Sequence, residues 1–299
     1  MNGPYGVWLG GLIAGWLVVS ASAMPASDTD TVSGSRRVHV VQAGESLSGL
    51  GARFGIEPRV LARLNFLPAD TRLRTGQWIV IDDRHIVPAF EEGDGIVVNV
   101  PQRMLFRFAD GALAAAYPAA VGHADSPTFR GGFTVTSLET DPVWDVPLSI
   151  QEEQRRAGKP VLARVPPGPG NPLGKHWIGL DRPSFGIHGT NAPSSIFGHR
   201  THGCIRLHPD DIAALFSAVC VGTRGWSIYQ PVLLAETGSG TILLEAHPDV
   251  YGLQPNAMVV VGVLAAQRGL SDRIDWALVA EVLLERDGTP VDISMPLWR

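Results

Sequence analysis

The sequence is poor in cysteine, in net charge and in long apolar segments. Its 299 residues include only two cysteines, Cys204 and Cys220, which do not make the disulfide framework of a small secreted domain. The formal net charge of −5 at pH 7 argues against a general nucleic-acid-binding protein. The apolar run from Val7 to Val19 is shorter than the ~20 residues that a membrane-spanning helix needs. What is present is a globular composition, with 45% hydrophobic and 18% charged residues, over a length that suits two domains.

The N-terminal segment has the features of an export signal. Residues 1–23 combine the short apolar run with Ala21-Ser22-Ala23, which is a small-x-small cleavage pattern. No Lys or Arg precedes the apolar run, so an uncleaved N-terminal anchor stays open beside a cleaved signal peptide. No cysteine stands directly after the run, which excludes a lipoprotein. Residues 24–35 are rich in Ser, Thr and Asp and are expected to form a flexible linker.

Chemistry concentrates around Cys204, in the run Thr201-His202-Gly203-Cys204-Ile205-Arg206-Leu207. A thiol is a nucleophile only as the thiolate, and a nearby imidazole is a common means of lowering its pKa. His188 lies far enough before Cys204 for a strand, a loop and a return to bring the two side chains together. Gly203 would leave room for a substrate carbonyl beside backbone amides, as an oxyanion hole requires. Arg206 could grip a substrate carboxylate with two hydrogen bonds. These residues predict a Cys–His acyl transferase.

Two other interpretations compete for the same residues. A zinc site would use Cys204 and the neighbouring histidines, but the spacing His199-x2-His202-x-Cys204-x3-His208 fits no usual zinc template. Alternatively, Cys204 is an inert core thiol, as free cysteines often are. Cys220 ends an apolar helical run and is expected to be such a core thiol. His202 is expected to orient its loop, and His199 and His208 to be solvated.

The chain then divides into three parts. Residues 36–83 read in the order strand, helix, helix, strand, and the stretch from Arg36 to Arg84 carries eight arginines against five acidic residues. Residues 94–231 show strand signals separated by tight turns and then a helix that begins at Pro209. This pattern predicts a mainly β domain with a helix after Cys204. Residues 232–299 contain strand and helix patterns to which the sequence assigns no role.

Two segments resemble the signature of the L,D-transpeptidases of the YkuD type. They are His188-Gly-Thr-Asn-Ala-Pro-Ser-Ser-Ile196 and Thr201-His-Gly-Cys-Ile-Arg-Leu207, within a likeness that covers about residues 84–232. The resemblance implies a β-sandwich or barrel in which Cys204 is the nucleophile and His188 the general base, oriented through the backbone of Gly189. The backbone amides of Gly203 and Cys204 would be the oxyanion donors. The expected substrate-binding side chains are those of Arg206, His202, Asn191 and Trp144.

The same resemblance implies an acyl-enzyme reaction on peptidoglycan, without a metal or an organic cofactor. The thiolate would attack the carbonyl between a meso-diaminopimelate residue and the terminal D-alanine of a stem peptide, and D-alanine would leave. An amine of a second stem, or of an outer-membrane lipoprotein, would then accept the acyl group. Two alternatives stay open, namely an L,D-carboxypeptidase that uses water and an inactive glycan-binding anchor.

Residues 36–83 resemble a LysM domain. The likeness is carried by Val41-Gln-Ala-Gly-Glu-Ser-Leu47 and Leu73-Arg-Thr-Gly-Gln-Trp-Ile-Val-Ile81. That family binds glycans that contain N-acetylglucosamine, so the resemblance implies peptidoglycan glycan strands as a partner and no nucleic acid. Together, the two resemblances and the export signal predict an exported, periplasmic protein.

Overall fold

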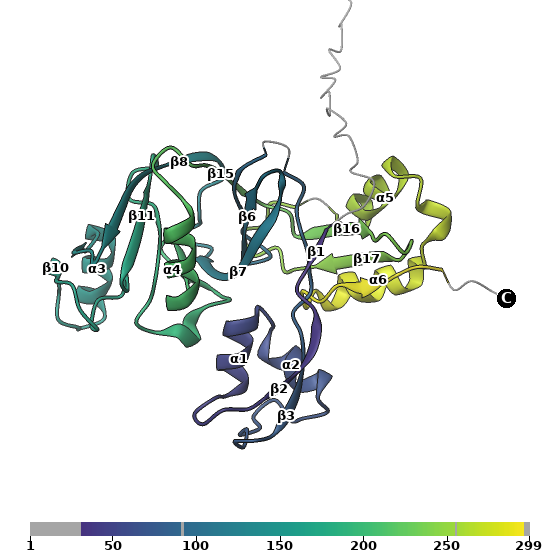
Figure 1. Ribbon diagram of the computed structural model, residues 1–299, viewed down its shortest axis with the longest axis horizontal. Coiled ribbons are helices and arrows are strands. Elements are labelled where there is room, and N and C mark those ends of the chain that lie inside the picture. Colours follow the sequence, from purple (N-terminus) through teal and green to yellow (C-terminus); the bar gives the residue numbers. More distant parts are fainter. Residues whose placement is uncertain (1–30, 91–92, 255, 296–299) are drawn as a thin grey trace, which may run out of the picture.

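The structure is a computed structural model that describes residues 31–90, 93–254 and 256–295. The described chain forms three units, which Figure 1 shows as a purple helical unit, a strand-rich teal and green unit, and a yellow C-terminal unit. The predicted export signal, residues 1–23, lies outside the described residues. Within them, no helix is long and apolar enough to cross a membrane.

The N-terminal unit has the predicted βααβ order. Its elements are β2 (Arg36–Val40), α1 (Leu47–Phe54), α2 (Pro58–Leu64) and β3 (Trp78–Asp82). Ser46 begins α1, because its hydroxyl accepts a hydrogen bond from the Gly49 N–H at 3.1 Å. Gly55 ends the helix in the left-handed conformation, with φ of 70°. The two helices cover one face of the β2–β3 pair through a small apolar core that includes Leu50, Leu61, Ile79 and Ile81.

The prediction of a flexible linker at residues 24–35 is wrong for the part that the structure describes. β1 (Val32–Ser33) pairs antiparallel with β4 (His85–Ile86), and the Ser33 side chain is buried. The N-terminal unit lies between β1 and β4 in the chain, so the pairing of these two strands joins its two ends. The physical reason is that Val32 packs against an apolar cluster that contains Ile86. This contact orders the segment although most of its residues are polar.

The central unit is a sheet that closes on itself. Its strands are β5 (Gly95–Asn99), β6 (Met104–Ala109), β7 (Ala112–Gly122), β8 (Gly131–Thr140), β11 (His176–Leu180), β12 (Gly186–His188), β13 (His199–Thr201), β14 (Ile205–Leu207) and β15 (Arg224–Ile228). They follow the order β13-β7-β14-β12-β11-β8-β15-β5-β6, and β6 also pairs with β7. This second pairing closes the sheet into a barrel, which confirms the mainly β prediction.

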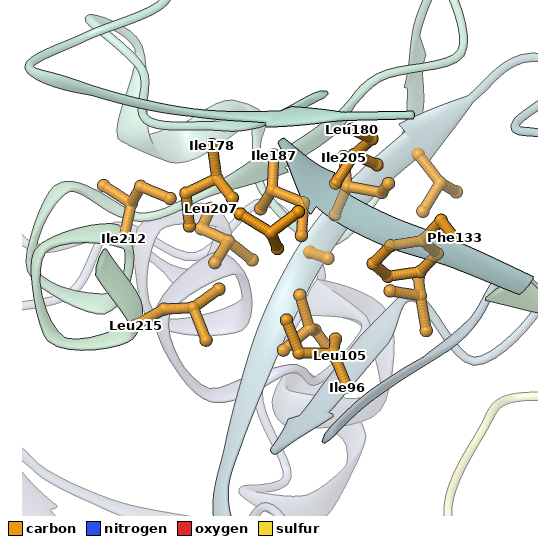
Figure 2. Close-up of a cluster of buried hydrophobic side chains, with 14 of the residues drawn as sticks. Ile96, Leu105, Phe133, Ile178, Leu180, Ile187, Ile205, Leu207, Ile212 and Leu215 are labelled. Carbon is orange, nitrogen blue, oxygen red and sulfur yellow. The ribbon is translucent and has the colours of Figure 1, made fainter. Parts of the chain in front are cut away.

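Side chains along β12 and β14 alternate between the barrel core and the opposite face of the sheet, which carries His188 and Arg206. Ile187 of β12 and Ile205 and Leu207 of β14 point into the buried cluster of Figure 2. Side chains in a strand alternate between faces, so the intervening His188 and Arg206 lie on the opposite face. The helix α4 (Pro209–Ala218) follows β14 directly and packs Ile212 and Leu215 against the same core. A helix after Cys204 was predicted, and it is present.

A less buried segment lies between β8 and β11. It contains β9 (Trp144–Asp145), α3 (Leu148–Arg156) and β10 (Arg164–Val165). The two short strands pair with each other and not with the barrel, and α3 buries none of its residues. The short 3-10 helix η1 (Pro193–Ser195) follows β12.

The C-terminal unit has its own core. It consists of β16 (Val232–Glu236), β17 (Ile242–Ala246), α5 (Ala257–Gln267), η2 (Ser271–Arg273), α6 (Trp276–Glu285) and β18 (Val291–Asp292). The three strands form a separate sheet, and both helices pack on it. β17 and α6 match the predicted strand and helix. Helix α5 was not predicted, because its residues are apolar on every side and show no helical period.

A buried carboxylate joins the three units. Glu245 of β17 is fully buried and accepts four hydrogen bonds of 2.6 to 3.0 Å, from the side chains of His85, Gln102 and His247 and from the N–H of Ile86. The other ring nitrogen of His85 lies 2.9 Å from the carbonyl oxygen of Gly55 in the N-terminal unit. A carboxylate and a carbonyl both accept, so both nitrogens of His85 carry protons. Burial acts to lower the pKa of His85, but the charge of Glu245 and the hydrogen bonds with Glu245 and Gly55 together raise it above its ordinary value.

Ion pairs also fix the N-terminal unit to the rest of the chain. Arg53 of α1 contacts Asp211 of α4 at 2.8 Å, and Glu57 pairs with the buried Arg103. In addition, Arg63 of α2 pairs with Asp287 of the C-terminal unit. The unit is therefore docked on both of its neighbours.

Candidate active site

His188 ends β12 and is held on three sides. Its strand pairs in parallel with β14, which places His188 beside Arg206 in register. On the other side it pairs with Trp177 of β11, and the two rings stack with centroids 5.9 Å apart and planes at 23°. The Nδ1 atom lies 2.7 Å from the carbonyl oxygen of Gly189. The side chain is buried and its ring cannot rotate without losing these contacts.

The contact with Gly189 also decides the tautomer of His188. A carbonyl oxygen only accepts, so Nδ1 carries the proton and Nε2 keeps its lone pair. Burial lowers the pKa of His188 to about 3, and the charge of Arg206 acts in the same direction. The imidazole is therefore neutral near pH 7, with Nε2 as its basic atom.

Cys204 lies immediately before β14 and belongs to the same face as Arg206, two residues later. Its thiol is half-buried and lies 3.5 Å from the carbonyl oxygen of Ser184, so the S–H can donate there. Burial raises the pKa of Cys204, although the Gly186 amide and the charge of Arg206 act against this effect. A lowered thiol pKa was expected. The structure gives the opposite direction, because the nearby imidazole is uncharged and the site is partly shielded from water.

Arg206 is a half-buried cation with spare donors. One guanidinium nitrogen donates to the Ser195 hydroxyl at 3.0 Å, and the buried Nε has no partner. Of the two nearby acids, Asp211 pairs with Arg53 and Asp210 lies against His208. No carboxylate lies within 4.0 Å of Arg206 in the described parts of the chain. Unsatisfied guanidinium donors beside a thiol are suited to holding an anionic group of a ligand.

The loop before Cys204 is fixed by two threonine hydroxyls. Gly203 has φ of 105°, and a side chain there would come within 2.5 Å of the Phe185 ring, so only glycine fits. The Gly203 N–H donates to the Thr201 hydroxyl at 3.2 Å, and that hydroxyl donates to the Cys204 carbonyl oxygen at 2.5 Å. Thr128 donates to the Gly203 carbonyl oxygen at 2.8 Å. Of the two expected oxyanion donors, the Gly203 N–H already donates to Thr201, so the Cys204 N–H is the one more available to an oxyanion.

The other expected substrate-binding residues lie around this centre. His202 donates through Nε2 to the Glu153 carboxylate at 2.9 Å, so it ties its loop to α3. Asn191 is exposed and donates to the Gly170 carbonyl oxygen at 3.2 Å. Trp144 lies on β9, and no hydrogen bond or ring contact joins it to His188 or Cys204 in the described chain. The structure thus places His188 beside Arg206 in register, and Arg206 near enough to Cys204 for its charge to act on the thiol, whereas Trp144 lies on a separate strand pair.

Two predictions about neighbouring residues are wrong. Cys220 was expected in the core, but it is exposed, because α4 ends at Ala218 and its buried side chains end before that point. His199 was expected to be solvated, but its Nε2 atom is buried, and burial lowers its pKa to about 4. Both cysteines are free thiols. Among the described residues, no group of three or more His, Cys, Asp or Glu side chains could hold a metal ion.

Several contacts of the site were not predicted. One of them is the stacking of Trp177 on His188. Ser195, Thr201 and Thr128 had no assigned role, although Ser195 accepts a hydrogen bond from Arg206 and the two threonine hydroxyls donate to backbone carbonyl oxygens of the site. Their partners are three or more positions away, and a single hydroxyl in a loop gives no periodic signal.

An uncharged thiol and an uncharged imidazole with a nearby guanidinium are suited to acyl transfer. The basic Nε2 can take the thiol proton as sulfur attacks a carbonyl, and Arg206 can hold an anionic substrate in place. Such a site has the parts that acyl transfer through a cysteine requires, on a closed β-sheet.

Comparison with known proteins identifies the family. A model of the L,D-transpeptidase catalytic domain matches residues 93–233, and a LysM model matches residues 39–82. The chain is 33% identical to the Salmonella typhimurium protein named "Probable L,D-transpeptidase ErfK/SrfK", over 84% of this chain and 83% of that protein. It is 32% identical to the Escherichia coli protein of the same name, over 77% of this chain and 74% of the other. It is also 27% identical to "Probable L,D-transpeptidase YcfS" of Escherichia coli, over 87% and 84% of the two chains.

The chain therefore belongs to the L,D-transpeptidase family, and carries a YkuD-type catalytic domain with an N-terminal LysM domain.

Proposed function

We propose that the protein is an exported peptidoglycan L,D-transpeptidase that uses Cys204 as its nucleophile and His188 as its base. The observation that carries this proposal is the tautomer of His188. Its Nδ1–H is committed to Gly189, which leaves Nε2 as a neutral base on the sheet face that also carries Cys204 and Arg206. Family membership supplies the substrate class, which is the stem peptide of peptidoglycan.

The proposed reaction begins with thiol and imidazole both neutral. As Sγ attacks the carbonyl before the terminal D-alanine, its proton passes to Nε2 of His188, so the thiolate forms only during the attack. The bond to D-alanine then breaks, and the imidazolium returns the proton to the leaving amine. An acceptor amine then attacks the thioester and gives its proton to Nε2, and the imidazolium returns that proton to the departing Sγ, which restores the neutral thiol of Cys204. The balance of protons is closed, and the cycle requires no cofactor.

The negative charge on the attacked carbonyl oxygen needs fixed donors. We propose the Cys204 N–H as the main donor and the Gly203 N–H as a secondary one, since Thr201 already accepts from it. A preorganised donor of this kind contributes roughly 3 to 4 kcal/mol to the stabilisation of the transition state. In this proposal, Arg206 binds a carboxylate of the donor stem, with Asn191, His202 and Trp144 as outer contacts.

Analysis of the products tests the proposal and separates the enzyme from its alternatives. Purified sacculi are incubated with the protein, digested with a muramidase, and analysed by mass spectrometry. A transpeptidase produces stems joined through their third residues and free D-alanine. A carboxypeptidase produces tripeptide stems without new cross-links, and an inactive anchor produces neither. Addition of a lipoprotein-derived peptide with a free lysine would identify that acceptor by a stem–peptide adduct.

Arg206→Lys is expected to lower the kcat/KM for D-alanine release by about tenfold or more, because an ammonium cannot copy the planar two-pronged contact with a carboxylate. The alkylation rate of Cys204 by iodoacetamide should stay within about twofold, since the reagent carries no anion to be held. Both rates are measured in a Cys220→Ser background, because Cys220 is exposed and would also react.

The alternative role for Arg206 is to hold its loop in shape. In that case the two rates would fall together, because Ser195 and the loop carrying Cys204 would both be displaced. A parallel loss of alkylation and turnover would therefore contradict the substrate-binding role.

For the LysM unit we propose binding to the glycan strands of peptidoglycan. Deletion of residues 36–83 is a poor test, because it would leave Arg103 and His85 without their partners Glu57 and Gly55. The intact Cys204→Ala chain is instead bound to sacculi and challenged with soluble chitooligosaccharides. Release of the protein is expected, whereas retention at saturating oligosaccharide would count against glycan recognition.

A further inference from the structure

A hydrogen-bonded chain runs from the C-terminal unit to the peptide bond that precedes Cys204. Tyr251 follows β17, and its hydroxyl donates to the Gly122 carbonyl oxygen at 2.7 Å and accepts from the Thr128 N–H at 3.0 Å. The side chain of Thr128, which is 2% exposed, accepts from the Gly122 N–H at 2.9 Å. The same hydroxyl donates to the Gly203 carbonyl oxygen at 2.8 Å.

Tyr251 is itself held rigidly. Its backbone N–H donates to the Tyr229 hydroxyl at 2.8 Å, and the two rings stack with centroids 5.2 Å apart and planes at 21°. The Tyr229 hydroxyl donates in turn to Asp249 at 2.6 Å. Asp249 also accepts the N–H groups of Leu253 and Gln254, which closes the loop around Tyr251. The Tyr251 hydroxyl can therefore serve as a fixed point.

The geometry of one peptide group connects this chain to catalysis. The Gly203 carbonyl and the Cys204 N–H belong to the same planar trans peptide, so they point in opposite directions. When Thr128 fixes the carbonyl oxygen, it also fixes the direction of the N–H. Gly203 has φ of 105° and no side chain, so the backbone on that side offers little resistance to rotation of the peptide plane. The hydrogen bond from Thr128 supplies that resistance.

We propose that Tyr251 is a positioning residue that acts through Thr128 to aim the Cys204 N–H at the oxyanion. The inference rests on the proposed function, and it gives the C-terminal unit a role in the active site. Tyr251 lies beyond residues 93–233, which the catalytic-domain model matches. On this account the catalytic domain is incomplete without a residue from the unit that follows it.

Two rates measured on the same variants test the inference. The first is kcat for D-alanine release from a tetrapeptide stem, which passes through an oxyanion. The second is alkylation of Cys204 by iodoacetamide, a substitution at carbon in which no oxyanion develops. All proteins carry Cys220→Ser, and the variants are Tyr251→Phe, Thr128→Val and Thr128→Ser.

Tyr251→Phe and Thr128→Val are expected to lower kcat by about ten- to a hundredfold, less than the ~10²- to 10³-fold cost of deleting an oxyanion donor. KM and the alkylation rate should stay within about twofold. Thr128→Ser keeps the hydroxyl and should retain most of the wild-type kcat. Tyr117→Phe is the matched control, because Tyr117 of β7 is also a partly buried tyrosine that packs against the barrel core.

The possible outcomes are distinct. Unchanged kcat in both Tyr251→Phe and Thr128→Val would overturn the inference. A parallel fall of kcat and alkylation would also overturn it, because that pattern belongs to a general loosening of the loop. If wild-type protein released no D-alanine, the proposed function itself would fail. An active wild type with an equally active Tyr251→Phe variant would remove only the role of Tyr251.

Discussion

Cys204→Ala is expected to lower the rate of D-alanine release at least about a thousandfold, because no other side chain at the site can form the acyl bond. The fold should persist, since the thiol is half-buried and its hydrogen bond to the Ser184 carbonyl oxygen is weak, at 3.5 Å. Release of D-alanine from a purified tetrapeptide stem is followed by a coupled D-amino-acid oxidase assay. Circular dichroism and thermal unfolding verify that the variant is folded.

The second cysteine provides the matched control for this experiment. Cys220 is exposed and lies beyond the end of α4, so Cys220→Ser should leave the rate within about twofold of wild type. Substantial turnover by Cys204→Ala, or an equal loss in both variants, would mean that the nucleophile lies elsewhere.

Glu245→Gln is expected to lower the free energy of unfolding by about 3 kcal/mol or more, because it removes one partner of a buried ion pair. Glu245 is fully buried and is the acceptor for His85, Gln102 and His247. The glutamine side chain that replaces it has the same shape, but its NH2 group cannot accept a hydrogen bond and would face one of these three donors. Urea unfolding at neutral pH, followed by tryptophan fluorescence, measures the difference.

The pH dependence of that difference identifies its cause. Burial would raise the pKa of Glu245, but the charge of His85 and the hydrogen bonds with His247 and His85 lower it from 4.5 to about 2. A lowered carboxyl pKa contributes stability that is complete above pH 4.5 and is lost as the pH falls toward 2. His85 has a raised pKa, so its contribution is complete below pH 6.5 and is lost as the pH rises through the folded value.

The gap between wild type and Glu245→Gln should therefore be largest between pH 4.5 and 6.5 and should shrink as the pH falls below that range. Glu281→Gln is the control, because Glu281 is exposed on α6 of the same unit and should change stability by less than about 0.5 kcal/mol. A Glu245→Gln effect as small as that of the control, or one independent of pH, would show that this carboxylate does not hold the three units together.

Much of the site could be predicted because its parts lie close together in the sequence. The short interval from His188 to Cys204 allowed one strand, one loop and one return, and the structure has the end of β12, η1 and β13 there, with β14 directly after Cys204. Strand alternation then decides that His188 and Arg206 share a face, opposite Ile187 and Ile205. The βααβ order of the N-terminal unit could be predicted in the same way, since Ser46, Gly55 and Pro58 mark the ends of its helices.

The features that could not be predicted depend on contacts between distant residues. His85 and Glu245 lie 160 positions apart, and nothing near either residue indicates the other. Tyr251 and Thr128 are also far apart and meet only because the C-terminal unit packs beside β7. The predicted direction of the Cys204 pKa shift was wrong for the same reason. The neighbouring sequence suggested a lowered pKa, whereas burial of the thiol in the folded protein raises it.

The most direct measurement is the mass of the acyl-enzyme. Wild-type protein is mixed with a tetrapeptide stem that lacks an acceptor amine, quenched in acid within the first turnover, and digested for peptide mapping by mass spectrometry. The account predicts a stem lacking its D-alanine attached as a thioester to the peptide that contains Cys204, and no adduct in Cys204→Ala. Free D-alanine formed without an adduct, or an adduct on any other residue, would contradict it.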